Sequence, residues 1–184
     1  MEYFYGGDFI GLSYYQSLLL LLLLLAALAD LKTDRIPNGF IMFGTAIGIL
    51  GGIWIHTGLP QSVFSMLLAF LLMYPLFKIG ALGAGDVKVF MMTGSFMEPK
   101  AFITVMVSAF VTGAVFSLGK LLIEHNGRER ISYFLSYVTE VARTGHWKIY
   151  GEYMVQDYQL YRRNKIHFTV PILFSVVMKL GGLV

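Results

Sequence analysis

SLLLLLLLLAALADLKTDRIPN, residues 17–38, joins a run of eight leucines to a short charged turn. The leucine run is typical of a lipid-facing helix, and Asp30 follows it closely. A carboxylate at membrane depth costs about 2.5–3.5 kcal/mol on insertion scales. A second aspartate, Asp86, lies in GAGDVK, residues 83–88, and opens another apolar segment. Two such residues at the ends of hydrophobic segments predict a functional site.

The composition is that of an integral membrane protein. Of 184 residues, 57% are hydrophobic and only 14% are charged, against about 25% charged in a soluble domain. The mean hydropathy is +0.68. The chain contains no cysteine, which excludes disulfides, a thiolate nucleophile and cysteine-bound zinc. Its four histidines are far apart in sequence, so we expect no metal and no cofactor.

Six segments are long or apolar enough to lie in a bilayer. They cover residues 13–29, 40–55, 62–77, 87–96, 101–123 and 168–183. A straight spanning helix needs about 20 apolar residues, so the fourth segment is short. We therefore predict an all-α bundle of about six transmembrane helices, forming one membrane-embedded domain over residues 1–184.

The basic residues predict the orientation of these spans. Twelve of the 14 Lys and Arg residues fall in or beside the first, third and fifth loops. The positive-inside rule places these loops in the cytoplasm and both termini outside. Asp30 ends the first span and Asp86 begins the fourth, so the topology puts both aspartates at the cytoplasmic face.

The fifth loop, residues 124–165, is long and carries apolar residues at helical spacing between 131 and 142. This spacing predicts an amphipathic helix on the inner membrane surface. Such a helix could solvate the loop or contact a substrate, and the sequence leaves both roles open.

Taken singly, each aspartate could be an ordinary loop charge. Asp34, beside Lys32 and Arg35, is interpreted in that way. What favours a site is the combination of a glycine-flanked Asp86 before one helix with Asp30 on the matching side. Two carboxylates that share one proton can activate water and protonate a carbonyl, as in aspartic proteases.

The two motifs resemble those of the type IV prepilin peptidases and archaeal preflagellin peptidases. Asp30 followed by Ile-Pro-Asn at 36–38 is similar to the first motif of that family. Residues 83–88, GAGDVK, are similar to its second motif, GxGD followed by a basic residue. The resemblance covers residues 12–123 well and 168–183 loosely. It implies an aspartic endopeptidase with Asp30 and Asp86 as the catalytic pair.

The resemblance also implies a substrate, a prepilin-like precursor with a short basic leader, a glycine at the cut and a hydrophobic helix. The chain would act from the plasma membrane with its site facing the cytoplasm. Its partners would be this precursor and the lipid bilayer, with no nucleic acid, and its oligomeric state stays open. The absence of cysteine pairs and the early first span resemble the short, peptidase-only branch.

Several neighbours of the aspartates are candidate substrate-binding or site-shaping residues. Gly83 and Gly85 would let an extended substrate pass close to Asp86. Lys88 either holds charge at the site or anchors its helix at the interface, and the second role is favoured. Pro37, with Asn38 beside it, is expected in the first turn of the second span.

The glycines at 44, 48, 51, 52 and 113 are interpreted instead as helix-packing contacts. Helix dipoles suggest that Asp86, at a helix start, is mostly the base, and that Asp30, near a helix end, is mostly the acid.

A second reading remains open. Intramembrane carboxylates also serve proton relays, so the same residues fit a proton- or cation-coupled carrier or a non-catalytic assembly scaffold. Transport that depends on Asp30 or Asp86, without a cut peptide, would identify that class.

Overall fold

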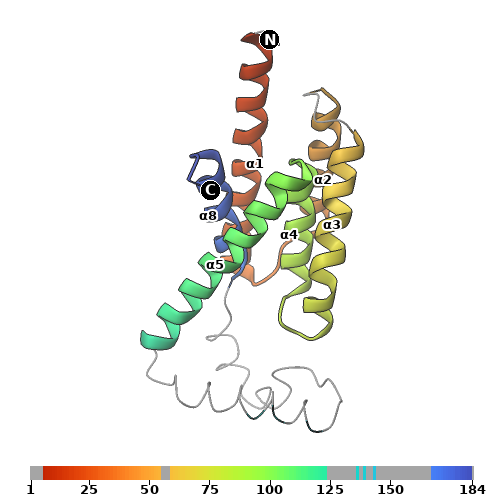
Figure 1. The fold of residues 1–184 in the computed structure, drawn as a ribbon. Coiled ribbons are helices and arrows are strands. Elements are labelled where there is room, and N and C mark those ends of the chain that lie inside the picture. Colours follow the sequence, from red (N-terminus) through yellow and green to blue (C-terminus); the bar gives the residue numbers. More distant parts are fainter. Residues whose placement is uncertain are drawn as a thin grey trace.

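The computed structural model describes residues 6–54, 59–123 and 167–183, together with Ser136, Thr139 and Arg143. All regular secondary structure in these residues is helical, which confirms the predicted all-α class (Figure 1). The helices are α1 (Gly6–Thr33), α2 (Asn38–Trp54), α3 (Leu59–Lys78), α4 (Ala84–Ser95), α5 (Pro99–Ile123) and α8 (Thr169–Leu180). The amphipathic helix predicted within 124–165 lies outside the described residues, apart from the three single positions.

The six helices coincide with the six apolar segments predicted from the sequence. Three of them are long and apolar enough to cross a membrane, namely Tyr14–Thr33 of α1, all of α3, and Pro99–Lys120 of α5. Helices α2 and α8 are apolar but shorter, and α4 has 12 residues. By length and composition, three of the six described helices could therefore cross a membrane, and the other three are shorter.

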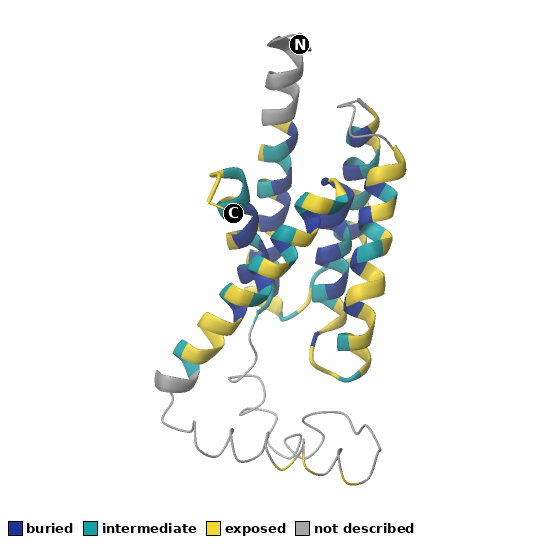
Figure 2. Cartoon of the chain, viewed as in Figure 1, coloured by how far each residue is buried: buried dark blue, intermediate teal, exposed yellow. Residues whose placement is uncertain are grey.

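The short helix α4 lies in the middle of the bundle (Figure 1). Residues 92–97 at its C-terminal end are all buried, whereas α3 and α5 each keep a broad exposed apolar face (Figure 2). Helix α3 makes the most extensive contact with α4. Their closest approach is at Gly94, where an added Cβ would lie 2.8 Å from the backbone oxygen of Ser65. The core is thus organised around α4.

At the end of α4 remote from Asp86, Tyr15 joins three helices. Its ring lies 4.8 Å from that of Phe96, between ring centroids, and its hydroxyl donates a hydrogen bond to the carbonyl of Gly48. A Cβ at Gly48 or Gly51 would overlap Phe96 or Tyr15 respectively. The predicted packing role of these two glycines is confirmed, and it holds α1, α2 and α4 together.

A cluster of aromatic rings holds the start of α8 in place. Phe168 lies 5.2 Å from Phe110 of α5 and 5.9 Å from Phe90 of α4, between ring centroids. Gly113 makes room for it, because a Cβ there would lie 2.8 Å from the Phe168 ring. This confirms a packing role for Gly113. The contact also fixes the positions of the residues on either side of Phe168.

We expect Gly94→Ala to destabilise the protein by about 1–3 kcal/mol, because the methyl group would press on the α3 backbone rather than on a flexible side chain. The measurement is thermal unfolding in detergent. Gly119→Ala is the matched control, since nothing lies within 4 Å of a Cβ there and alanine favours helix over glycine. Equal melting temperatures for the two variants would contradict the close α3–α4 contact.

Candidate functional site

Asp30 occupies the last turn of α1, and its side chain is buried despite its charge. The whole residue is 5% exposed. The helix ends at Thr33, and the N–H of the next residue, Asp34, donates to the Asp30 carbonyl over 2.9 Å. Asp34 has a φ of 55°, in the left-handed region that ends many helices and that aspartate tolerates better than most residues. This ending turns the chain sharply after α1.

The turn after α1 is held by its own side chains. The hydroxyl of Thr33 bonds the carbonyls of Ala29 and Arg35 at 2.8 and 2.7 Å. Pro37 directly precedes α2, and its carbonyl accepts the N–H groups of Phe40 and Ile41. Pro37 therefore lies at the N-cap of α2. The sequence predicted it one position later, in the first helical turn.

Asp86 is the third residue of α4, in the first helical turn. Its Oδ2 accepts the backbone N–H of Gly83 over 3.1 Å, as an acidic residue does in a capping box. A Cβ on Gly83 would lie 3.1 Å from the same oxygen, so any other residue there would push the carboxylate aside by a few tenths of an ångström. At Gly85 the nearest atom to a Cβ, on Ile36, is 3.9 Å away, which is ordinary contact. Gly83 is thus the more constrained of the two glycines.

Lys88, one turn into α4, connects the two motifs. Its Nζ donates to Oδ1 of Asn38 over 2.7 Å. Because Asn38 begins α2, this bond holds the start of α2 against the start of α4. Lys88 also lines the pocket described below, and the interface-anchoring role favoured from the sequence stays a prediction.

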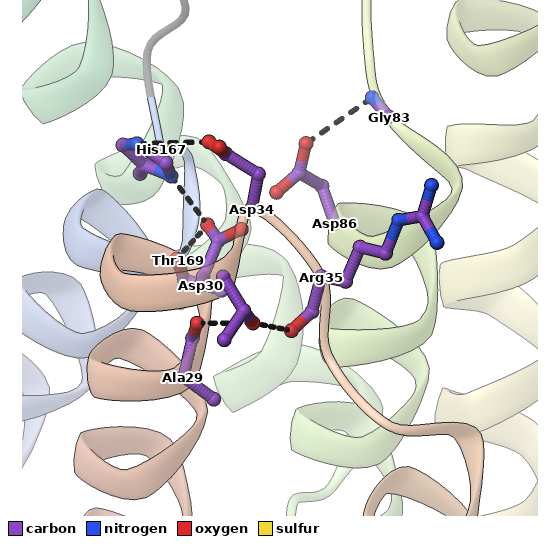
Figure 3. Close-up of polar contacts among 9 residues, drawn as sticks. Ala29, Asp30, Asp34, Arg35, Gly83, Asp86, His167 and Thr169 are labelled. Carbon is purple, nitrogen blue, oxygen red and sulfur yellow. Dashed lines mark hydrogen bonds and ion pairs between the residues drawn. The ribbon is translucent and has the colours of Figure 1, made fainter.

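Residues at the start of α8 complete the surroundings of Asp30 (Figure 3). The Thr169 hydroxyl donates to Asp30 Oδ2 over 2.6 Å. The His167 imidazole lies between two carboxylates, with Nδ1 3.2 Å from Asp30 Oδ2 and Nε2 3.7 Å from Asp34 Oδ1. Nδ1 is buried, and no described residue gives it an aligned hydrogen bond. His167 and Asp30 are therefore in close contact without an aligned hydrogen bond.

These parts surround one pocket of about 540 Å³. Asp30 and Asp86 both line it, so the structure brings together the two aspartates that the sequence singled out. The pocket is open at exposed residues such as Asn38 and Ala84. The remaining lining comes from the turn after α1 and the start of α4: Thr33, Asp34, Arg35, Ile36, Pro37, Gly83, Gly85 and Lys88.

The pocket is polar and carries both signs of charge. Its wall holds three carboxylates and two basic side chains. In the described part of the chain, no group of three His, Cys, Asp or Glu side chains is arranged to hold a metal ion. The available chemistry among these side chains is that of proton transfer and hydrogen bonding.

A sequence model of the type IV leader peptidase family matches residues 17–118, more than half of the chain. The chain belongs to the type IV leader peptidase family. The match covers both aspartate motifs and ends before α8. Neither the curated proteins nor the solved structures yield a match. The chain is thus a type IV leader peptidase-like protease, in agreement with the resemblance of its motifs.

Sequence reasoning missed one residue that lines the pocket, Asp34, and two that contact Asp30, His167 and Thr169. His167 and Thr169 lie more than 130 positions from Asp30, and no motif connects them to it. Asp34 was interpreted as an ordinary surface charge, but its side chain is only 26% exposed and faces His167. The available signal was a histidine directly ahead of the last apolar segment, on the side of the membrane predicted for both aspartates.

A cysteine scan tests the pocket, because the chain has no cysteine of its own. Ala84 lines the pocket and is exposed, whereas Val87, one turn later, is 6% exposed. We expect Ala84→Cys to react with a small charged thiol reagent and Val87→Cys to stay unmodified in the folded protein. Mass spectrometry measures both. Equal labelling of the two positions would contradict the pocket geometry.

Proposed function

We propose that this protein is an aspartic endopeptidase that removes the short basic leader from prepilin-like precursors, with Asp30 and Asp86 as the catalytic pair. The observation that carries the proposal is their shared position on the wall of one pocket. Membership of the type IV leader peptidase family supports peptide hydrolysis and argues against the carrier and scaffold readings.

The pair can supply both halves of the chemistry. One ionised carboxylate takes a proton from water, and the water oxygen attacks the scissile carbonyl carbon. The protonated carboxyl of the other aspartate donates to the carbonyl oxygen. When the tetrahedral intermediate collapses, the C–N bond breaks and a proton passes to the leaving nitrogen. Two neighbouring carboxylates that share a single proton suit this exchange.

Helix dipoles do not by themselves decide which aspartate begins as the base. Asp86 lies in the first turn of α4 and Asp30 in the last turn of α1, as the sequence suggested. However, Asp30 also accepts a hydrogen bond from Thr169 at the N-terminus of α8, where the dipole favours an anion. The expected asymmetry therefore loses its basis, and the pair is best treated as one titrating unit.

The substrate would approach along the glycine turn before α4. Gly83 and Ala84 are both exposed beside Asp86, so an extended peptide can come close to that carboxylate. The hydrophobic helix of a precursor would remain in the lipid, where α3 and α5 present apolar faces. The leader would then leave through the open, polar end of the pocket.

We further propose that the pocket opens to the cytoplasm and lies inside the membrane boundary. Because the rings of Tyr15 and Phe96 are in contact, these two residues lie at the same depth in the helix bundle. Asp30 lies fifteen positions after Tyr15 in α1, which corresponds to about 22 Å along the helix. The hydrocarbon core of a bilayer is about 30 Å thick. The basic residues Lys32 and Arg35, near the pocket, favour the cytoplasmic side. All six helices would lie in the membrane, with both termini outside.

Asp30→Asn and Asp86→Asn should each reduce cleavage below detection, because each removes one of two required proton-transfer roles. The measurement is co-expression with candidate prepilin-like precursors, followed by gel mobility and N-terminal sequencing of the product. Glu98→Gln is the matched control, since Glu98 is an exposed carboxylate in the turn between α4 and α5, remote from this pocket. Cleavage that persists in Asp30→Asn would refute the proposed pair.

Gly83→Ala should lower cleavage several-fold, because its methyl group would lie 3.1 Å from Asp86 Oδ2 and push that carboxylate by a few tenths of an ångström. A misplacement of about 1 Å can cost on the order of 100-fold in rate. Gly85→Ala provides the comparison, since its Cβ meets only ordinary contact. The initial rates of the two purified variants should differ clearly, and a larger loss in Gly85→Ala would contradict this account of Asp86.

A further inference from the structure

The carboxylates of Asp30 and Asp86 are held in similar ways by unrelated parts of the chain. Each has its Oδ2 in contact with a donor, the Thr169 hydroxyl for Asp30 and the Gly83 N–H for Asp86. Figure 3 shows the second oxygen of each aspartate turned toward the space between them. For Asp30, the contact at Oδ2 therefore determines which oxygen can meet a water or a substrate carbonyl.

For Asp86 this arrangement is local, because Gly83 lies three residues away. For Asp30 the orientation of the carboxylate depends on residues at the start of α8 and directly before it. The nearby turn of α1 supplies no substitute, since Thr33 bonds the carbonyls of Ala29 and Arg35 instead. Without Thr169 and His167, the carboxylate could rotate about its side-chain torsions and exchange its two oxygens.

We infer that Thr169 and His167 are positioning residues for hydrolysis, holding Asp30 with Oδ2 toward α8 and Oδ1 toward the reacting atoms. This inference rests on the proposed function of Asp30. It assigns a role in the reaction to α8, which lies beyond the part of the chain that the family match covers. Thr169 supplies a directed hydrogen bond, and His167 supplies an imidazole against the same oxygen.

The aromatic contacts explain how α8 can hold this position. Phe168, between the two positioning residues, packs against Phe90 and Phe110. The ring is therefore fixed to α4 and α5, while its two neighbours face α1. Thr169 is 1% exposed, so water does not readily replace its hydroxyl. A rigid, dry donor of this kind restricts the carboxylate more than a solvent contact would.

The competing interpretation is that Thr169 and His167 only fasten α8 to α1. The two interpretations differ in kinetics. A fastening role affects the amount of folded protein, and each folded molecule would still cut at the normal rate. A positioning role lowers kcat in folded protein and leaves KM nearly unchanged, because the precursor binds without needing the orientation of Asp30.

The experiment uses the full chain in detergent, with a prepilin-like precursor that the wild-type protein cuts. Thr169→Val, which is nearly isosteric, and His167→Ala should each lower kcat about 10- to 100-fold, with KM within about twofold. Thr169→Ser should recover most of the rate, because it restores the donor. The double variant should lose less than the product of the two single losses, since both residues act on one oxygen.

Ser175→Ala is the matched control, because Ser175 is a fully buried polar residue of α8 that bonds the Pro171 carbonyl instead of Asp30. It should keep the wild-type kcat. Each rate is divided by the amount of folded protein, which is measured by size-exclusion chromatography and thermal unfolding.

Wild-type kcat in folded Thr169→Val and His167→Ala, with Asp30→Asn inactive, would overturn the positioning role and leave the proposed function intact. If Thr169→Val does not fold, Thr169→Ala takes its place as the variant without a donor: full rates in both Thr169→Ala and His167→Ala would overturn the inference. Cleavage by Asp30→Asn, or no cleavage of any precursor by the wild-type protein, would instead remove the proposed function, and this inference with it.

Discussion

A carboxylate buried at the end of a leucine-rich helix is the constraint on which the rest of the arrangement depends. Asp30 is 5% exposed, and a buried charge without partners is strongly unfavourable. Its partners come from Thr169 and His167, at the start of the last described helix. The fold must therefore bring the C-terminal end of the first described helix, α1, to the start of the last, α8. The aromatic packing of Phe168 provides that junction.

The pocket lies at the N-terminal end of α4, which is shorter than its neighbours α2 and α3. Helices α4 and α8 each have 12 residues, which is about 18 Å of helix, and each carries part of the site at its N-terminus. Both are too short to cross a bilayer of about 30 Å, and the pocket lies beyond the first turn of α4. Irregular backbone is tolerated at membrane depth where it lines a wet cavity. The glycine turn before α4 would satisfy that condition at the proposed depth, because it lines the pocket.

The two aspartates depend on different levels of structure. Asp86 is held by the N–H of Gly83, within its own helix start, so its geometry follows from four consecutive residues. Asp30 is held by residues from a distant segment, and its geometry follows from the packing of α8 against α1 and α5. A substitution far from the pocket, in the α5–α8 contact, can therefore disturb Asp30 while leaving Asp86 in place.

The sequence by itself determined the helical class, the approximate bounds of six apolar segments and the identity of both aspartates. It could do so because hydrophobic runs, glycine turns and costly carboxylates are local features. It also indicated that the glycines of α2 serve packing, which the Tyr15 contacts confirm at Gly48 and Gly51. Only the tertiary structure decided that His167 and Thr169 meet Asp30, and that Asp34 faces the same pocket. Those contacts join segments more than 130 positions apart, and they arise from helix packing, which leaves no local pattern along the chain.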